Sequence, residues 1–233
     1  MEKMMKLEKM FSLQNDLNNY TNGLGWVDGF TENGLEIDWL RCVRMEMVEA
    51  IDQSISWKHW KNIKDTKQYE PIGKDGLNNL EIEIVDGWHF LMSEAIKQCW
   101  EKETISKILS LENKSIYLKG KNLVNSIDNI QKLCFKYEDD NTFDNFMELI
   151  ELYTLVSFAF LNINKLYEKY ILKNVLNIFR QKNGYKDGSY IKEWGKNKIE
   201  DNKFIDKYIE NNQEIIFESI YSYLEKEYKT LNS

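Results

Sequence analysis

Apolar residues recur at spacings of three and four along most of the chain, which is the pattern of helices that bury one face. This pattern predicts helices over residues 4–20, 37–55, 79–100, 143–181 and 201–229, with shorter helices between 102 and 136. Glycines and polar clusters predict loops over 23–37, 62–78, 137–141 and 183–198. No stretch alternates between apolar and polar residues for long enough to predict a strand. The sequence therefore predicts an all-α helical bundle.

Length and composition agree with this prediction and restrict the classes of function. At 233 residues the chain can bury a large core, so we expect one domain, 1–233, or one domain with a mobile part around 100–150. The formal net charge of −7 argues against nonspecific nucleic-acid binding, which requires a basic surface.

Nothing in the sequence predicts a membrane or secreted protein. The N-terminus is charged, and the longest mostly apolar stretch, 152–163, is shorter than the ~20 residues that a membrane-spanning helix needs. The three cysteines form no C-x-x-C pair, which favours free thiols in a reducing compartment. We therefore expect a soluble, cytoplasmic protein that binds neither nucleic acid nor membrane.

Two acidic pairs lie on the second and third predicted helices. Glu46 and Glu49 are three residues apart, as are Glu83 and Asp86, so the members of each pair are separated by about 60° around the helix. The helix over 79–100 is apolar around most of its circumference, so at least one of its acids is expected to be half-buried. Converging carboxylates repel unless a cation lies between them, and Mg²⁺ prefers oxygen ligands. These four residues are therefore candidate magnesium ligands.

A basic segment follows far downstream and is a candidate for binding phosphate. Residues 171–200 contain seven Lys or Arg and three Asp or Glu, in a chain that is otherwise acidic. Lys173, Asn177 and Arg180 share one helix face, and Arg180 can bind two phosphate oxygens at once. The next loop carries three further candidates, Tyr185, Lys186 and Lys192. The Asn-Gly and Asp-Gly turns of this loop would let it close over a ligand. Together, the acidic pairs and the basic segment indicate magnesium-dependent cleavage of a nucleoside triphosphate.

Polar and aromatic residues elsewhere are candidates for binding a nucleobase. Gln14 and Asn18 continue the apolar stripe of the first helix, and their amides match the acceptors and the donor of a uracil edge. Trp60 can stack on a base, and Phe90 lies between the two acids of the third helix in projection. His89 falls on the apolar side of the same helix.

Each of these groups also has a purely structural interpretation. The acids could form a solvated face, and the basic residues could be a solvated helix end, where they lie favourably against the helix dipole. The two amides could mark a helix end that emerges into solvent. The tryptophan, the histidine and the phenylalanine could be ordinary core residues.

In their order along the chain, these residues resemble the all-α dimeric dUTPases, relatives of the MazG-type nucleotide pyrophosphohydrolases. The resemblance covers the first 100 residues and about 150–203, and its most specific part is Lys173 through Tyr190. Further matching segments are Leu13-Gln14-x-x-Leu17-Asn18, Glu46-x-x-Glu49, Trp57 through Asn62, Glu83-Ile84-Val85-Asp86 with His89-Phe90, and Glu200-Asp201-Asn202. The sequence departs from the family pattern at Gly87, where a larger apolar residue is usual, and this predicts looser packing beside the acids.

The resemblance implies a helical bundle with a mobile lid segment, a homodimer, and hydrolysis of dUTP, with dUDP as a further substrate, to dUMP. It implies that Mg²⁺ is held by Glu46, Glu49, Glu83 and Asp86. It implies a deoxyuridine pocket lined by Gln14, Asn18, Trp60, His89 and Phe90. It implies that phosphates are held, and the lid closed, by Lys173, Asn177, Arg180, Tyr185, Lys186 and Lys192.

We expect in-line attack by a water that magnesium activates, with Glu49 as the catalytic residue that orients or deprotonates the water and Glu46 as the second candidate. Two alternatives stay open at this point. One is a MazG-like pyrophosphohydrolase of different base specificity, and the other is a helical nucleotide-binding or interaction protein without catalytic activity.

Overall fold

A computed structural model describes residues 1–61, 66–114, 116–211 and 215–232. In chain order the elements are α1 (Glu2–Asn22), the 3-10 turn η1 (Trp26–Asp28), α2 (Trp39–Ser54), α3 (Gly76–Lys97), α4 (Glu101–Leu111), α5 (Lys121–Asp139), α6 (Phe143–Phe158), α7 (Ile163–Lys182), β1 (Glu193–Trp194), β2 (Ile199–Glu200), α8 (Asn202–Asn211) and α9 (Phe217–Leu231). The predicted all-α class is confirmed, since the sheet in the described part is one pair of two-residue strands.

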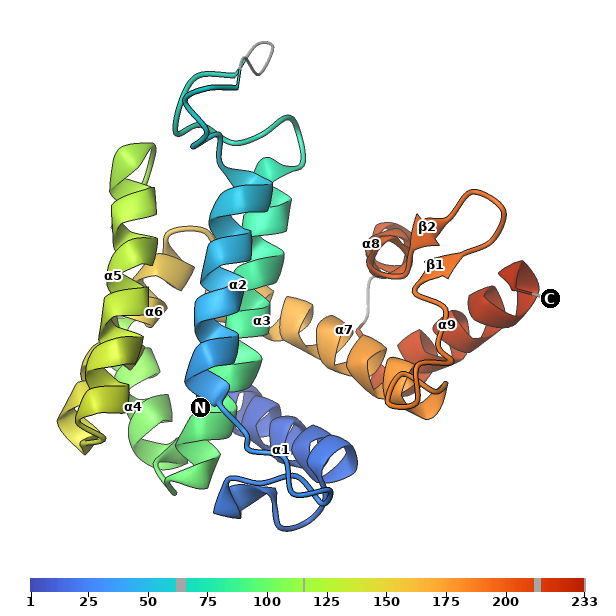
Figure 1. The fold of residues 1–233 in the computed structure, drawn as a ribbon, viewed down its shortest axis with the longest axis horizontal. Helices are drawn as coiled ribbons and strands as arrows, with labels where there is room; N and C mark the ends of the chain where they lie inside the picture. The colour runs from blue at the N-terminus through green and yellow to red at the C-terminus, as the bar shows by residue number, and fades with distance from the viewer. Residues whose placement is uncertain (62–65, 115, 212–214, 233) are drawn as a thin grey trace.

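Helices α2 and α3 run side by side at the centre of the molecule (Figure 1). Helix α5 packs on α2, and α4 and α6 complete this end of the bundle. Helices α1 and α7 pack on each other and on α3, and α7 leads to the β1–β2 hairpin, α8 and α9 at the opposite end. No single described helix is long and apolar enough to cross a membrane; α6 and α7 reach that length only together, and they are bent by 98°.

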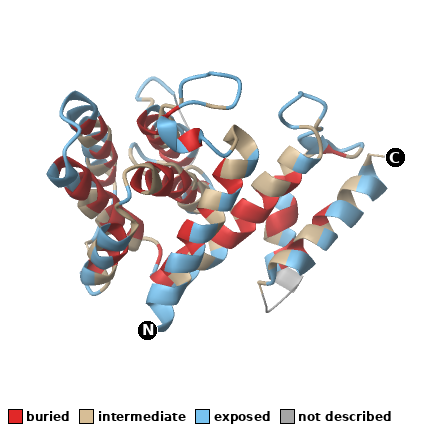
Figure 2. Ribbon diagram, turned by 90° about the horizontal axis from the view of Figure 1, so that it is seen from below, coloured by how far each residue is buried: buried red, intermediate tan, exposed pale blue. Residues whose placement is uncertain are grey.

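The central pair forms because both helices have a local start signal and a wide apolar face. The Asp38 carboxylate accepts a hydrogen bond of 2.8 Å from the Arg41 amide and so caps α2. Val43, Met47 and Ala50 of α2 are fully buried against α3. Figure 2 shows the resulting pattern, in which buried residues line the inner faces of the helices and exposed residues cover the outside.

Two predicted long helices are each divided in the structure. The helix predicted over 143–181 is α6 and α7, separated by residues 159–162, and Asn162 caps α7 by accepting a hydrogen bond of 2.9 Å from the Lys165 amide. The helix predicted over 201–229 is α8 and α9, and part of the segment between them, 212–214, lies outside the described residues. Leu161 and Ile163 are buried on either side of the first break, so the apolar pattern continues where the helix does not.

Three predicted loops also differ from the structure. The predicted polar break at 137–141 begins later, because α5 continues to Asp139. The loop predicted over 183–198 contains β1 and the start of a hairpin, whose strands are too short to show an alternating pattern. The loop predicted over 62–78 lies partly outside the described residues, and its last residues belong to α3, which begins at Gly76.

The expectation of loose packing at Gly87 is wrong. A Cβ atom built on Gly87 would lie 2.0 Å from the hydroxyl oxygen of Tyr153, which donates a hydrogen bond of 2.8 Å to the Ile84 carbonyl. Tyr153 is fully buried and packs edge-on against Trp88. The glycine therefore leaves room for a tyrosine from α6 to reach the backbone of α3, close to the acids.

We expect Gly87→Ala to destabilise the protein by about 1–3 kcal/mol, because the added methyl group would displace the Tyr153 hydroxyl. At an ordinary helix position the same change would stabilise by up to ~1 kcal/mol. Denaturant unfolding of Gly87→Ala, Tyr153→Phe and the double variant separates the two cases. In the double variant the alanine should cost little beyond Tyr153→Phe alone, whereas a stabilising Gly87→Ala in the wild-type background would contradict the close contact.

Candidate active site

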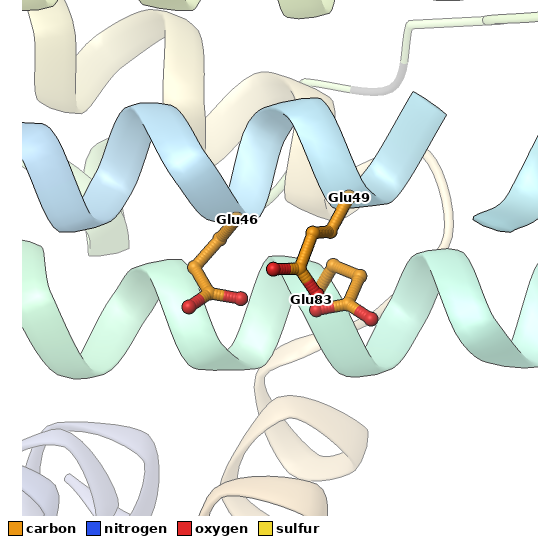
Figure 3. Close-up of side chains that lie close together, drawn as sticks. All are labelled: Glu46, Glu49 and Glu83. Carbon is orange, nitrogen blue, oxygen red and sulfur yellow. The ribbon is translucent and has the colours of Figure 1, made fainter. Parts of the chain in front are cut away.

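Three of the four predicted metal-ligating acids come together between α2 and α3. Carboxylate oxygens of Glu46, Glu49 and Glu83 lie within 4.8 Å of one another. Glu46 and Glu49 extend from α2 toward α3, and the Glu83 side chain lies on α3 beside that of Glu49 (Figure 3). Among the described residues this is the cluster of acids whose geometry suits a metal ion.

The environment of the cluster disfavours the charged forms of Glu46 and Glu83. Burial, followed by the negative charge of Asp86, raises the pKa of both Glu46 and Glu83. A hydrogen bond links the two side chains, and this bond requires a proton on one of the two carboxyl groups. Such a site carries more negative charge than the protein around it neutralises.

The fourth predicted ligand, Asp86, lies on α3 one turn beyond Glu83 and is bound by a lysine. The Lys173 ammonium of α7 is 2.8 Å from the Asp86 carboxylate, and both side chains are largely buried. Lys173 therefore joins the acid cluster to the predicted phosphate-binding segment. Asp86 remains close enough to raise the pKa of both Glu46 and Glu83.

A cavity of about 330 Å³ opens beside these groups. Its wall contains residues of all three predicted sets: Gln14, Asn18, Glu46, Asp86, His89, Phe90, Lys173, Asn177, Arg180 and Tyr185. Further lining residues that the sequence analysis did not select are Leu17, Thr21, Asn22, Trp39 and Gln181. The structure thus brings most of the predicted site residues to one cavity from α1, α2, α3 and α7.

Lys173 and Arg180, the two cations of the basic segment that line the cavity, are paired with the chain's own carboxylates. Lys173 binds Asp86, as described above, and Arg180 forms hydrogen bonds of 2.8 and 2.7 Å to the two oxygens of Asp201. The Nη1 atom of Arg180 lies 3.3 Å from the side-chain oxygen of Asn177. The predicted common face of Lys173, Asn177 and Arg180 is therefore observed, and it faces the cavity.

The amides of α1 belong to a buried hydrogen-bond network. The Gln14 oxygen accepts from the Tyr170 hydroxyl at 2.8 Å and from Nδ1 of His89 at 2.7 Å. The Gln14 amide nitrogen donates to Asn18 at 2.9 Å and to Ser93 at 3.0 Å. All four hydrogen-bonding positions of Gln14 are thereby filled, which fixes its orientation and that of its neighbours.

This network determines the tautomer of His89. Because the Gln14 oxygen only accepts, Nδ1 of His89 carries the proton, and Nε2 is left as an acceptor. Within the described residues Nε2 is buried and has no hydrogen-bond partner, although His89 lines the cavity. The ring also stacks on Tyr170, with centroids 4.3 Å apart.

Burial lowers the pKa of His89 from its ordinary 6.5 to about 4, so the imidazole is neutral in the folded protein at neutral pH. The unfolded chain binds this proton below pH ~6.5 and the folded protein only near pH 4, so stability should fall as the pH drops from 6.5 toward 4. Protonation of His89 alone should lower the free energy of unfolding by roughly 2–3 kcal/mol over this pH range. Above pH 6.5 the contribution is constant.

Unfolding free energies at pH 4.5 and pH 7.5 for the wild type and for His89→Gln test this expectation. The wild type should lose about 2–3 kcal/mol more than the variant between the two pH values. An equal loss in both proteins would mean that His89 is protonated in the folded state.

Three predicted substrate-binding residues do not line the cavity. The Trp60 side chain is 63% exposed and packs against His59 and Trp57. Lys186 is exposed and pairs with Glu32, and Lys192 is exposed. In this chain Trp60, Lys186 and Lys192 therefore lie outside the group of residues that the fold has assembled.

Several residues of the site escaped the sequence analysis. Ser93 and Tyr170 have signals that could have found them, since Ser93 lies four residues after His89 and Tyr170 three residues before Lys173, each on a shared helix face. Trp39 stacks on Phe90 with centroids 6.0 Å apart, and nothing in its spacing distinguishes it from a core residue. Asp201 stands in a matched segment but was given no role.

The fold is all-α, and at its cavity acids that suit a cation stand beside basic residues that suit phosphates, as in enzymes that act on nucleotides. The sequence pattern of the dUTPase family matches residues 6–185, well over half of the chain. The chain therefore belongs to the dUTPase family and is an enzyme of the dUTP diphosphatase type. No match to an individually curated protein was found. The match ends before the hairpin, α8 and α9, so 186–233 lies outside it.

Proposed function

We propose that this enzyme hydrolyses dUTP to dUMP and pyrophosphate with Mg²⁺, and that it also converts dUDP to dUMP and phosphate. The observation that carries the proposal is the position of the three-glutamate cluster beside a cavity lined by Lys173, Asn177 and Arg180. A nucleotide in this cavity can place its phosphates between the acids and the basic helix face. The family match supports the uracil nucleotide as the substrate.

The donor set fits a magnesium ion. Glu46, Glu49, Glu83 and Asp86 offer carboxylate oxygens alone, which is the ligand type that Mg²⁺ prefers. Burial and then the neighbouring charge of Asp86 raise the pKa of Glu46 and Glu83, and a divalent cation would favour their charged forms. When bound, Mg²⁺ would lower the pKa of the attacking water and shield the charge that develops on the phosphates.

Residues of the chain accept the proton from water and hold the phosphates. We assign to Glu49 the role of accepting a proton from the attacking water, and its carboxylate is oriented by a hydrogen bond of 3.0 Å from Gln53. Glu46 is the second candidate for this role. Lys173 and Arg180 hold phosphate oxygens through charge, with Asn177 between them, and this orients the phosphorus for in-line attack.

Selection of the base follows from the neutral His89. Its Nε2 atom is a buried acceptor, which matches the N3–H of uracil and is repelled by the N3 acceptor of cytosine. Asn18 retains one N–H for a uracil oxygen, because its other N–H donates to Ser93 at 2.9 Å. The Trp39–Phe90 stack forms an aromatic wall of the same cavity. Exclusion of thymine must rest on the shape of the cavity, since thymine has the same N3–H.

We further propose a cytoplasmic homodimer in which Tyr185, Lys186 and Lys192 belong to a segment that closes over the phosphates. Exposed apolar side chains at Met45 and Val48 of α2 support an interface between copies. Trp60 lies away from the cavity of its own chain, so a contact with deoxyuridine would require a second copy to supply it. Sedimentation of the full chain measures the oligomeric state.

The proposed function is tested by phosphate and pyrophosphate release from dUTP, dUDP, dCTP, dTTP and UTP at equal concentrations. We expect dUTP and dUDP to be preferred, and chelation of Mg²⁺ with EDTA to abolish release. Similar rates for all the nucleotides would favour a MazG-like enzyme of broader base specificity. No release from any of them would favour a protein that binds nucleotides without catalysis.

A further inference from the structure

The Arg180 guanidinium is held by a carboxylate from the segment beyond the family match. Its Nε and Nη2 atoms donate to the two oxygens of Asp201 at 2.8 and 2.7 Å, which is a bidentate pair. Asp201 is completely buried. The remaining nitrogen, Nη1, lies 3.3 Å from Asn177, and both Arg180 and Asn177 line the cavity.

Asp201 is itself fixed on two sides. The Tyr190 hydroxyl donates a hydrogen bond of 2.8 Å to Oδ2 of Asp201. Asp201 lies between β2 and α8, and its backbone amide donates to the Lys192 carbonyl at 3.1 Å, which closes the hairpin. The carboxylate therefore has a defined position from which it can orient the guanidinium.

The hairpin and α9 have a separate attachment to α7, formed by aromatic residues. The Phe179 ring contacts the rings of Tyr190, Trp194, Tyr221 and Tyr228, at centroid distances of 5.5 to 6.2 Å. Trp194 and Phe204 are also buried and stack on each other, with centroids 4.5 Å apart. Neither Arg180 nor Asp201 belongs to this aromatic contact, and Tyr190 takes part in both attachments. A buried ion pair is in any case weak as a source of stability, because both charges lose their hydration.

We propose that Asp201, supported by Tyr190, is a positioning residue that holds Arg180 with its Nη1 edge toward the phosphates of the bound nucleotide. The proposal rests on the proposed function and gives a role to the part of the chain after residue 185. An arginine free to rotate would have to be ordered each time a nucleotide binds, and this lost side-chain entropy would weaken binding. The loss should weaken binding of the phosphates and leave binding of the nucleoside unchanged.

The test compares Asp201→Asn with the wild type for binding of the hydrolysis-resistant α,β-imido-dUTP and of deoxyuridine, by calorimetry with the full chain and Mg²⁺. We expect the imido nucleotide to bind about 10- to 100-fold more weakly and deoxyuridine to bind equally well. The KM for dUTP should rise by a similar factor. Glu193→Gln, which makes the same change at an exposed acid of the same hairpin, should bind both ligands as the wild type does.

Equal binding of the imido nucleotide by Asp201→Asn and the wild type would overturn the proposal. So would an equal loss for both ligands, which indicates a structural role. If Asp201→Asn does not fold, Tyr190→Phe provides the same comparison, because its ring keeps the stack on Tyr228, and it should weaken only the imido nucleotide, by a few-fold. A wild type that binds no uracil nucleotide would refute the proposed function and this proposal together, whereas a wild type that binds and hydrolyses dUTP leaves Asp201 to be judged by its variants.

Discussion

Glu49→Gln is expected to lower kcat for dUTP by about 10²–10⁴-fold while KM changes little. The amide keeps the size and one oxygen of the carboxylate, so it can still lie beside Glu46 and Glu83, but it cannot take a proton from water. Of the three clustered acids, Glu49 is the one to which we assign the role of base, with Glu46 as the second candidate. Steady-state pyrophosphate release at saturating Mg²⁺ measures the effect.

The control for this variant is Glu81→Gln. Glu81 lies on α3 two residues before Glu83 but pairs with Lys165 and Lys169, away from the cluster. This variant should keep the turnover of the wild type. Full turnover by Glu49→Gln would remove the assignment of Glu49 as base, and a larger loss in Glu46→Gln would transfer the role to Glu46.

The helices that form the site could be predicted because their signals are local. Helix α2 has an N-cap at Asp38 followed by apolar residues at helical spacing, and α3 is apolar around most of its surface. The spacing of Glu46, Glu49 and Glu83 then places these acids on facing sides once the two helices pack. The same spacing predicted Asp86 among them, whereas Asp86 is paired with Lys173 of α7.

The breaks in the longer helices could not be predicted from the apolar pattern. Between α6 and α7 the buried positions continue through Leu161 and Ile163, and the turn contains neither glycine nor proline. Asn162 caps α7, but a single asparagine is compatible with a helix interior as well. A change of direction by 98° is a property of the packed helices, and local spacing does not contain it.

For a similar reason, the sequence could not predict which carboxylates pair with the predicted cations. Lys173 and Arg180 were correctly placed on one helix face, but their pairing with Asp86 and Asp201 depends on where α3 and α8 lie in space. The sequence shows a surplus of positive charge over 171–200. In the structure each of the two cations is paired with a carboxylate from another element, so the surplus is smaller at the site than in the sequence.

The Asp86–Lys173 pair leads to the last prediction, because its two members are proposed to bind different ligands. At 2.8 Å and with both side chains largely buried, the lysine competes with a cation for Asp86. Lys173→Ala should therefore have opposite effects on the two ligands. Mg²⁺ alone should bind a few-fold to tenfold more tightly. The imido nucleotide should bind about 10- to 100-fold more weakly, because a charged contact to phosphate is lost.

Calorimetric titration of Mg²⁺ alone, and of α,β-imido-dUTP with Mg²⁺ present, measures both effects. Lys169→Ala is the matched control, since Lys169 lies one turn earlier on α7, pairs with Glu81 and does not line the cavity. It removes the same charge and should change neither affinity by more than about twofold. Weaker binding of Mg²⁺ to Lys173→Ala would show that the lysine does not compete for Asp86, and the assignment of Asp86 as a metal ligand would then fail, because a ligand released from its ammonium partner must bind the cation better.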